Sequence, residues 1–289
     1  MKIYVHIGLQ KTGTTTLQSD IFPKLKTVGF SGRTAREFGG SSKIYYQLCE
    51  YCFAPKADTA LLLKLVAGIG EALKTKELLI SEEWFSSDYD GFYYGSGCCW
   101  QEKLKRLGVV LRGLNAVVLI SERDVSSALF SIYCQNMQRA KAMNYGSFSN
   151  FYRSVNDAKA YRNKYLKSVI ETNITCRIES LPFDMLKKDS QGYMALLSGI
   201  FSESISADYG DRNNLKKKSS HGTVIKQDNR ITMLIRSLSR MLPYFLLKVI
   251  KSKLNINLHS INSIFKKEVV VTRPTQIEIE EIRLLYKND

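Results

Sequence analysis

The sequence contains no long hydrophobic run. Its most apolar stretch, residues 241–250, is interrupted by Pro243 and Lys248, whereas a membrane-spanning helix needs about 18 to 20 apolar residues in succession. No apolar segment stands between Met1 and the first predicted strand, so no secretory signal peptide is predicted. We therefore expect a cytoplasmic protein without a spanning helix.

Internal repeats and low-complexity segments are also absent, and 16 tyrosines and 13 phenylalanines argue against disorder. The six cysteines fit reduced thiols in the cytoplasm. A zinc site built from Cys49, Cys52, Cys98 and Cys99 is disfavoured, because two of these residues are adjacent and the first two fall in a predicted helix, residues 44–53. We expect buried or half-buried cysteines and no metal.

Acidic residues are too few to balance the basic ones: 42 Lys and Arg stand against 27 Asp and Glu, a net charge of +15. Residues 212–253 hold eleven basic residues and one acidic residue, Asp228, so this segment alone carries 11 − 1 = +10. Such a surface attracts polyanions, anionic lipid or a highly charged cosubstrate. Composition does not choose among them, although no nucleic-acid recognition motif is present and no nucleic acid is expected.

Predicted strands alternate with predicted helices along the chain. The strands are residues 2–7, 77–81, 116–121 and 174–178, and the helices are 13–26, 44–53, 59–75, 101–112, 125–142, a helical region from 147 to about 172, 186–201 and 276–286. The strand at 116–121 is apolar throughout, as in a parallel sheet covered on both faces. This order predicts an α/β protein with three layers, a central parallel sheet flanked by helices.

The first strand leads into the loop His6-Ile7-Gly8-Leu9-Gln10-Lys11-Thr12-Gly13 and then into Thr14-Thr15-Thr16-Leu17. Gly8 and Gly13 have the separation found in nucleotide-binding loops, but Thr14 stands where those loops need lysine, and the lysine is Lys11. ATP or GTP hydrolysis is therefore disfavoured. The loop suits one phosphate-like group, bound by backbone N–H groups and hydroxyls of residues 12–16 with Lys11 at the mouth.

This run resembles the 5′-phosphosulfate loop of sulfotransferases that use 3′-phosphoadenosine 5′-phosphosulfate (PAPS), most closely the bacterial and Golgi-type carbohydrate sulfotransferases. One departure is Gln10, where many members have proline. The resemblance implies a P-loop-like fold, PAPS as cosubstrate and no required metal. It also implies donor binding by Lys11, Thr12, Gly13, Thr14, Thr15 and Thr16. Lys11 would then stabilise charge on the bridging oxygen of the departing group.

A second match to the same family lies at the end of the strand 116–121. The family has an arginine there and a serine eight residues later, which hold the 3′-phosphate of the donor; this chain has Arg123 and Ser131. Arginine offers a bidentate fork to phosphate. The alternative interpretation of Arg123 is a surface ion pair with a neighbouring carboxylate.

A third match is the pair Glu82-Glu83 after the strand 77–81. A sugar hydroxyl needs a base to take its proton, and Glu83 corresponds to the glutamate of a Ser-x-Glu triplet in similar bacterial members, with Glu82 as the second candidate. A solvated acidic pair remains the alternative. His6 lies inside the first strand, where a buried, hydrogen-bonded histidine is expected rather than a base.

Later segments are less informative. Lys216, Lys217 and Lys218 lie where the family closes the donor site, but a solvated lysine run explains them about as well. Residues 229–254 form a predicted basic amphipathic helix that either docks on the domain or rests on an anionic membrane surface. Thr275 and Glu278 form a capping box before the last helix. The resemblance covers residues 1 to about 220 and the final helix, 276–286, and we expect a single sulfotransferase domain over residues 1–289.

These patterns predict an enzyme that moves a sulfuryl group from PAPS to a hydroxyl of a glycan or glycolipid. The alternatives are another phosphate-loop enzyme, such as a small-molecule kinase, and a polyanion-binding protein. The acceptor is expected to meet variable loops, here residues 31–42, 86–97 and 143–150. Their aromatic residues either stack on sugars or fill the core: Tyr89, Phe92, Tyr93, Tyr94 and Trp100.

Overall fold

The computed structural model describes residues 1–33, 41–89, 93, 97–138, 145–205, 222–227 and 267–287. The chain divides into two compact units. The first, called the sheet unit here, consists of residues 1–128, 154–212 and 281–289, and the second unit consists of residues 129–153 and 213–280. Each is described by itself.

The sheet unit is built on five parallel strands in the order β2-β3-β1-β4-β5. Their bounds are β1 Lys2–His6, β2 Val28–Gly32, β3 Glu77–Ser81, β4 Asn115–Glu122 and β5 Cys176–Pro182. In the central register, Val5 of β1 lies between Ile80 of β3 and Val118 of β4. The predicted α/β architecture with a parallel sheet is confirmed.

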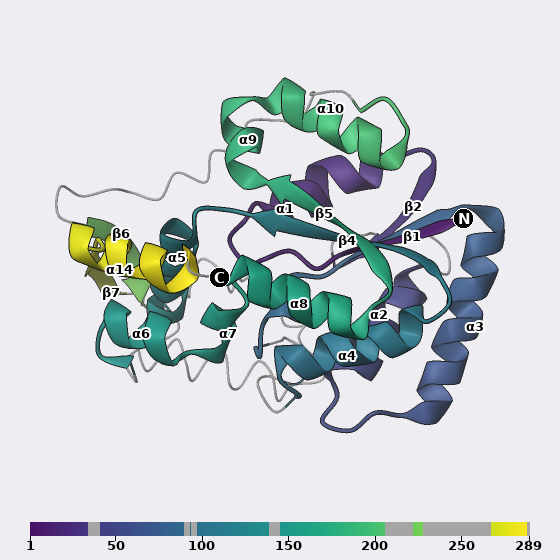
Figure 1. Cartoon of the computed structure of the whole chain (residues 1–289), viewed down its shortest axis with the longest axis horizontal. Helices are drawn as coiled ribbons and strands as arrows, with labels where there is room; N and C mark the ends of the chain where they lie inside the picture. Colours follow the sequence, from purple (N-terminus) through teal and green to yellow (C-terminus); the bar gives the residue numbers. More distant parts are fainter. Residues whose placement is uncertain are drawn as a thin grey trace, which may run out of the picture. The chain divides into compact units, whose positions relative to one another are not determined.

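Helices cover both faces of this sheet (Figure 1). One layer contains α1 Thr14–Thr16, α9 Phe183–Lys188 and α10 Ser190–Phe201. The other contains α2 Ser41–Phe53, α3 Thr59–Thr75, α4 Trp100–Leu111 and α8 Asn163–Asn173, and the short α7 Asn156–Lys159 precedes α8. Two covered faces explain why the central strands are apolar without alternation.

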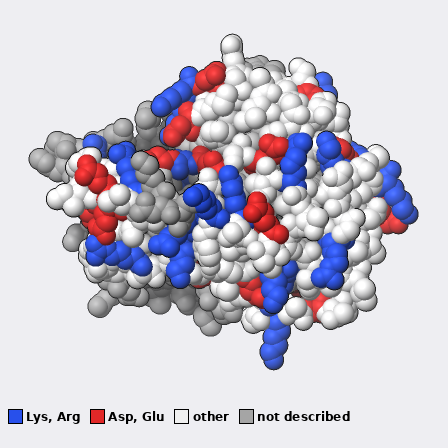
Figure 2. Space-filling view, viewed as in Figure 1, with Lys and Arg blue, Asp and Glu red and all other residues white. Residues whose placement is uncertain are grey.

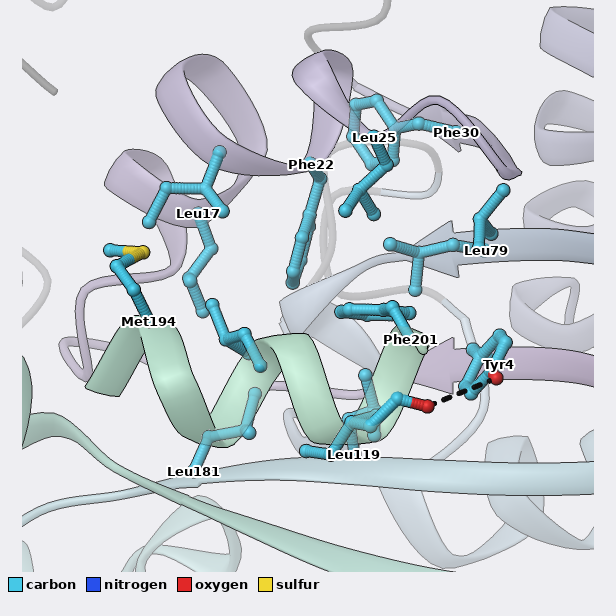
Figure 3. Close-up of a cluster of buried hydrophobic side chains, with 14 of the residues drawn as sticks. Tyr4, Leu17, Phe22, Leu25, Phe30, Leu79, Leu119, Leu181, Met194 and Phe201 are labelled. Atoms are coloured by element: carbon cyan, nitrogen blue, oxygen red, sulfur yellow. Dashed lines mark hydrogen bonds between the residues drawn. The ribbon is translucent and has the colours of Figure 1, made fainter. Parts of the chain in front are cut away.

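A buried cluster holds the first layer to the sheet (Figure 3). Phe22 and Phe201 contribute fully or almost fully buried rings to it, and Leu119 supplies the sheet side. The hydroxyl of Tyr4 in β1 donates to the carbonyl of Ile200 over 3.2 Å, so the cluster also contains a satisfied polar contact. This packing anchors β1 and α10 and thereby fixes the base of the loop that follows β1.

The first helix is less regular than predicted. It begins at Thr14 as α1, continues as a π-helical turn over Leu17–Ile21, and ends as a 3₁₀ turn over Phe22–Lys24. Pro23 has no N–H to donate to a carbonyl of the preceding turn, which accounts for the change in helix type near the end.

Strand β2 was not predicted, and the prediction of a loop from residue 31 is wrong at its start. Ser31 and Gly32 belong to β2 and are buried, whereas residues 34–40 of that loop lie outside the described residues. The strand reads Val-Gly-Phe-Ser-Gly, with two glycines in five residues. Glycine is poor in strands, so sequence pattern alone did not reveal β2.

Two predicted helical regions are divided in the structure. The region from residue 147 becomes α6 Phe148–Ser154, α7 and α8, and the region from 186 becomes α9 and α10, with the change at Asp189. The Asp189 carboxylate accepts the N–H of Gly192 over 2.9 Å and caps α10, as polar N-cap residues do. Because the breaks are short, the spacing of apolar residues continues across them, and the sequence pattern did not reveal them.

The second unit includes an antiparallel pair, β6 Gly222–Gln227 and β7 Lys267–Thr272, which the sequence did not predict. The boundary between the units falls inside α5 Val125–Gln138 and inside α14 Gln276–Lys287. The predicted capping box of α14 is confirmed: the Thr275 N–H donates to Glu278 Oε2 over 2.9 Å, and the Glu278 N–H to Thr275 Oγ1 over 3.2 Å.

Acidic and basic side chains are interspersed on the described surface of the sheet unit (Figure 2). Arg177 pairs with Glu179 over 2.8 Å, and Lys167 with Glu122 over 3.4 Å. The lysine run at 216–218 and the predicted basic helix at 229–254 lie outside the described residues, so their roles stay predictions. In the described ranges, every helix is too short or too polar for a bilayer crossing.

Candidate active site

The candidate residues of the sheet unit lie at the carboxyl end of its parallel strands. Lys11 follows β1, Arg33 follows β2, Glu82 and Glu83 follow β3, and Arg123 follows β4. Because β1 is central and the chain leaves it first toward β2 and β3 and later toward β4, the strand order reverses beside β1. Open α/β sheets bind ligands at such a point.

The loop after β1 is tightly folded. Gly8, Lys11 and Gly13 have φ angles of 59°, 66° and 81°, in the left-handed region that glycine adopts at little cost. A Cβ atom on Gly13 would lie 2.2 Å from Cε2 of Phe183. A side chain at Gly13 is therefore excluded both by its φ angle and by the Phe183 ring.

The loop presents backbone donors at the start of α1. Gly13 is the N-cap residue of α1, and no side chain caps the helix there. The first hydrogen bond of the helix is donated by the Leu17 N–H to the Gly13 carbonyl over 3.2 Å. The N–H groups just before Leu17 thus have no carbonyl four residues back within the helix. The buried Thr12 hydroxyl donates to the Leu9 carbonyl and so shapes the loop itself.

Arg123 is in direct contact with this loop, although more than a hundred residues separate the two in sequence. Its Nη1 donates to the carbonyl oxygen of Lys11 over 2.8 Å. The Tyr161 hydroxyl donates to the next carbonyl back, that of Gln10, over 2.6 Å. Burial lowers the pKa of Arg123, and the nearby carboxylates of Asp184 and Asp124 oppose this effect. The structure thus brings Arg123 of the second predicted motif into contact with the first.

A pocket of about 260 Å³ opens beside Arg123, between the ends of β4 and β5. It contains one guanidinium and two carboxylates together with apolar and aromatic surface, and its lining consists of Leu9, Glu122, Arg123, Tyr161, Asn163, Leu166, Pro182 and Asp184. The mixture of a cation, hydrogen-bonding groups and an aromatic ring suits part of a polar ligand such as a nucleotide.

Glu83 reaches the loop from the end of β3. Its side chain is 23% exposed, and its Oε2 accepts the hydroxyl of Thr14 over 2.6 Å. Glu83 also begins the 3₁₀ turn η3 Glu83–Ser86. A partly exposed carboxylate at this loop is open to an acceptor, so Glu83 remains a candidate base.

Glu82 has a different environment, because its side chain is completely buried. Its oxygens accept hydrogen bonds from the Arg33 guanidinium, the Tyr45 hydroxyl and the Trp84 N–H, the last over 3.0 Å. Burial raises the pKa of Glu82, while Arg33, Tyr45 and the Trp84 N–H oppose that rise. With its oxygens engaged inside the protein, Glu82 is a structural residue, which favours Glu83 as the candidate base.

Arg33 was missed by sequence reasoning because β2 was not recognised. Once β2 is known, the signal is simple: Arg33 directly follows the strand that neighbours β3.

His6 has no exposed surface and lies between two hydroxyls, with Nδ1 2.7 Å from Ser81 Oγ and Nε2 2.8 Å from Ser121 Oγ. Burial lowers its pKa to about 3, so the ring is neutral. The expectation of a buried, hydrogen-bonded histidine is confirmed. The network joins β1, β3 and β4 beneath the loop.

The remaining predicted residues are less informative. Ser131 is half-buried in α5 and belongs to the second unit, so its contact with a 3′-phosphate stays a prediction. Trp100 is completely buried and its indole N–H donates to the Asn156 carbonyl, so it fills the core. Residues 90–92, 94–96 and 143–144 of the expected acceptor loops lie outside the described residues.

The thiols of Cys49 and Cys52 are buried in α2, and burial raises the pKa of both. Over the ranges that the structure describes, no group of three or more His, Cys, Asp or Glu side chains is arranged to hold a metal ion.

Comparisons with known proteins give little beyond the fold. No family model matches the sequence, and no curated protein matches it. Among solved structures, a sulfotransferase from Alicyclobacillus acidocaldarius aligns with 10% identity and a TM-score of 0.40, covering 74% of this chain and 85% of its own. A thymidylate kinase from Candida albicans aligns with 16% identity and a TM-score of 0.31, covering 71% and 96%. Likenesses this distant do not assign a function.

Proposed function

We propose that this protein is a sulfotransferase that moves a sulfuryl group from PAPS to the hydroxyl of a carbohydrate or glycolipid. The observation that carries the proposal is the hydrogen bond from Arg123 to the Lys11 carbonyl. It places a guanidinium directly beside an anion-binding loop that has its own lysine. A ligand with two separate phosphate groups fits such a pair of cationic positions.

In this proposal the backbone N–H groups of residues 12–16 and the Lys11 ammonium bind the 5′-phosphosulfate. Arg123 binds the 3′-phosphate, and Ser131 stays a sequence-based candidate for the same group. The Thr14 and Thr12 hydroxyls are already engaged with Glu83 and Leu9, so they shape the loop, and the donors to the ligand are the N–H groups and the hydroxyls of Thr15 and Thr16. No metal is needed, because the cations are side chains.

Transfer is an in-line displacement at sulfur. Glu83 accepts the proton of the acceptor hydroxyl, the hydroxyl oxygen forms a bond to sulfur, and the bond between sulfur and the bridging phosphate oxygen breaks. The electron pair of that bond leaves with 3′-phosphoadenosine 5′-phosphate (PAP), and Lys11 stabilises the charge that develops on the oxygen. The contact of the Glu83 carboxylate with the loop through Thr14 supports this assignment.

The acceptor class is proposed from the family resemblance of the loop and not from the pocket. The basic segment at 229–254 would hold the enzyme at an anionic membrane surface if the acceptor is a glycolipid. The competing function is a small-molecule kinase, which the threonine at position 14 disfavours because it removes the lysine that such a loop needs.

Calorimetric titration tests the proposal. We expect PAP to bind without Mg²⁺ and at least tenfold more tightly than ADP, which lacks the 3′-phosphate. Arg123→Ala should weaken PAP binding and leave ADP binding nearly unchanged, whereas the matched control Arg177→Met, which removes an exposed ion pair on β5, should change neither. Equal affinities for PAP and ADP, or a strict need for Mg²⁺, would contradict the proposal and favour a kinase.

A further inference from the structure

Arg33 connects both glutamates at the end of β3. Its Nη2 donates to Oε1 of the buried Glu82, and its Nη1 lies 3.7 Å from Oε1 of Glu83. The guanidinium also stacks on the Trp84 ring, with the central carbon 3.5 Å from the ring centroid. Burial by itself lowers the pKa of Arg33, but Glu82 and Glu83 outweigh that effect and raise it.

Glu82 needs a partner of opposite charge, because its side chain has no exposed surface. Burying a carboxylate destabilises the folded protein unless the carboxylate is paired and hydrogen-bonded. Arg33 supplies the compensating charge. Glu82 in turn caps the turn η3, since its carboxylate accepts the Trp84 N–H over 3.0 Å. The charge of Arg33 therefore stabilises the capped conformation of the backbone on which Glu83 stands.

The two oxygens of Glu83 are held by different parts of the fold. Oε2 accepts the Thr14 hydroxyl over 2.6 Å, and Oε1 faces Arg33 over 3.7 Å. The far end of η3 is fixed independently, because the Lys103 ammonium donates to the Ser87 carbonyl over 2.7 Å. The Glu83 carboxylate is thus held by groups from the loop after β1 and from the end of β2, the strands on either side of β3.

We propose that Arg33 is a positioning residue that acts through Glu82 and directly on Glu83, and that it sets the orientation of the catalytic carboxylate toward the acceptor hydroxyl. This inference depends on the proposed function, since it assumes that Glu83 is the base. It predicts that loss of Arg33 impairs proton removal from the acceptor without impairing donor binding, which is the task of the loop, Lys11 and Arg123.

The test compares Arg33→Met, which retains an apolar side chain against Trp84 without the charge, with Arg33→Lys and with Arg177→Met as the exposed control. PAP affinity is measured by calorimetry, and kcat is measured with radiolabelled PAPS on the best acceptor from a panel of hydroxyl compounds that includes water. We expect Arg33→Met to lower kcat at least tenfold with PAP affinity within twofold of wild type. Arg33→Lys should restore part of kcat, and Arg177→Met should match wild type.

A double variant tests whether Arg33 acts through Glu82. If it does, the double variant Glu82→Gln/Arg33→Met should have a kcat only slightly below that of Arg33→Met alone. The reason is that Glu82→Gln removes the buried charge that Arg33 compensates. Hydrogen exchange of residues 81–87 should speed up in Arg33→Met and not in Arg177→Met, a readout that needs no acceptor.

The outcomes separate the two proposals. If wild type turns over PAPS and binds PAP, but Arg33→Met keeps full kcat or shows unchanged exchange at residues 81–87, the positioning role is wrong and the sulfotransferase proposal stands. A parallel loss of PAP affinity and kcat would also contradict positioning, because it would indicate a general disturbance of the site. If wild type neither binds PAP nor transfers sulfuryl to any acceptor, both proposals fail.

Discussion

The Thr14 hydroxyl donates a 2.6 Å hydrogen bond to Oε2 of Glu83. This bond joins the loop that would hold the sulfuryl donor to the carboxylate that would deprotonate the acceptor, although the two residues belong to different strand ends. The proposed donor-binding and acid–base parts of the site are thus joined by a direct hydrogen bond. Closure of the loop around a donor and orientation of the base are therefore expected to depend on each other.

Thr14→Val tests this connection. The variant keeps the shape and the backbone N–H of Thr14 but removes the hydroxyl, and a hydrogen bond to a charged group contributes about 1.5 to 3 kcal/mol. We expect kcat to fall about ten- to a hundredfold, with PAP affinity little changed. Thr14→Ser, which keeps the hydroxyl, serves as the control and should stay within a few-fold of wild type. A Thr14→Val enzyme with wild-type kcat would show that the bond has no role in transfer.

The choice between the two glutamates is tested by Glu83→Gln. Because Glu83 is partly exposed and contacts the loop, its loss as a base should lower kcat by about 10² to 10⁴ and leave the calorimetric affinity for PAP near that of wild type. The measurement is transfer of labelled sulfate from PAPS by wild type and by Glu83→Gln. Retention of full activity by Glu83→Gln would mean that Glu82 or another group is the base.

Lys11 should matter for the chemical step more than for folding. Lys11→Ala removes the cation expected to stabilise the leaving oxygen, and loss of one such group costs about 10² to 10³ in kcat. The thermal midpoint of the variant should stay within a few degrees of wild type. Single-turnover transfer from bound PAPS measures the step directly, and an unchanged single-turnover rate would rule out this role for Lys11.

Asp184 is expected to oppose binding of a second phosphate. Its carboxylate lines the pocket beside Arg123 and acts on the Arg123 charge. Asp184→Asn should therefore raise the affinity for PAP, by about two- to tenfold at low salt and less at high salt, where charge interactions are screened. Glu71→Gln, which changes an exposed ion pair on α3, is the control. Weaker PAP binding by Asp184→Asn would place the phosphate elsewhere.

His6 should make the fold sensitive to acid. Its pKa is about 3 in the folded protein against 6.5 for an unperturbed histidine, so below pH 6.5 the unfolded chain binds a proton that the folded protein does not. The free energy of unfolding should therefore fall by about 1.4 kcal/mol per pH unit from this group between about pH 6.5 and 3, and be unaffected above that range.

Urea unfolding of wild type and His6→Asn from pH 8 to 5 isolates this contribution, since the other titrating groups are common to both. The variant should have a lower free energy of unfolding than wild type at pH 8. Between pH 8 and pH 5, that free energy should fall less in the variant than in wild type. Equal slopes would mean that the His6 ring is not held neutral in the folded protein.

The sequence alone determined that the sheet unit is an α/β structure with a parallel sheet, and it predicted the candidate residues. The apolar strands at 77–81 and 116–121, the glycine spacing of the first loop and the capping box at Thr275 are local patterns, and local backbone preferences and burial periodicity set them. Lys11, Glu82, Glu83 and Arg123 were named as candidates from motif spacing and a family resemblance, and they follow parallel strands whose carboxyl ends lie at one edge of the sheet.

Only the tertiary structure decided how the environments of these residues differ. Glu82 and Glu83 are the same residue type in adjacent positions, but Tyr45 and Arg33 donate to a completely buried Glu82, whereas Glu83 stays partly exposed and faces Arg33 at 3.7 Å. Arg33 itself follows a strand too rich in glycine to be recognised from its pattern. Burial and pairing depend on which neighbouring strand end covers a side chain, and that is a property of the assembled sheet, not of any local sequence.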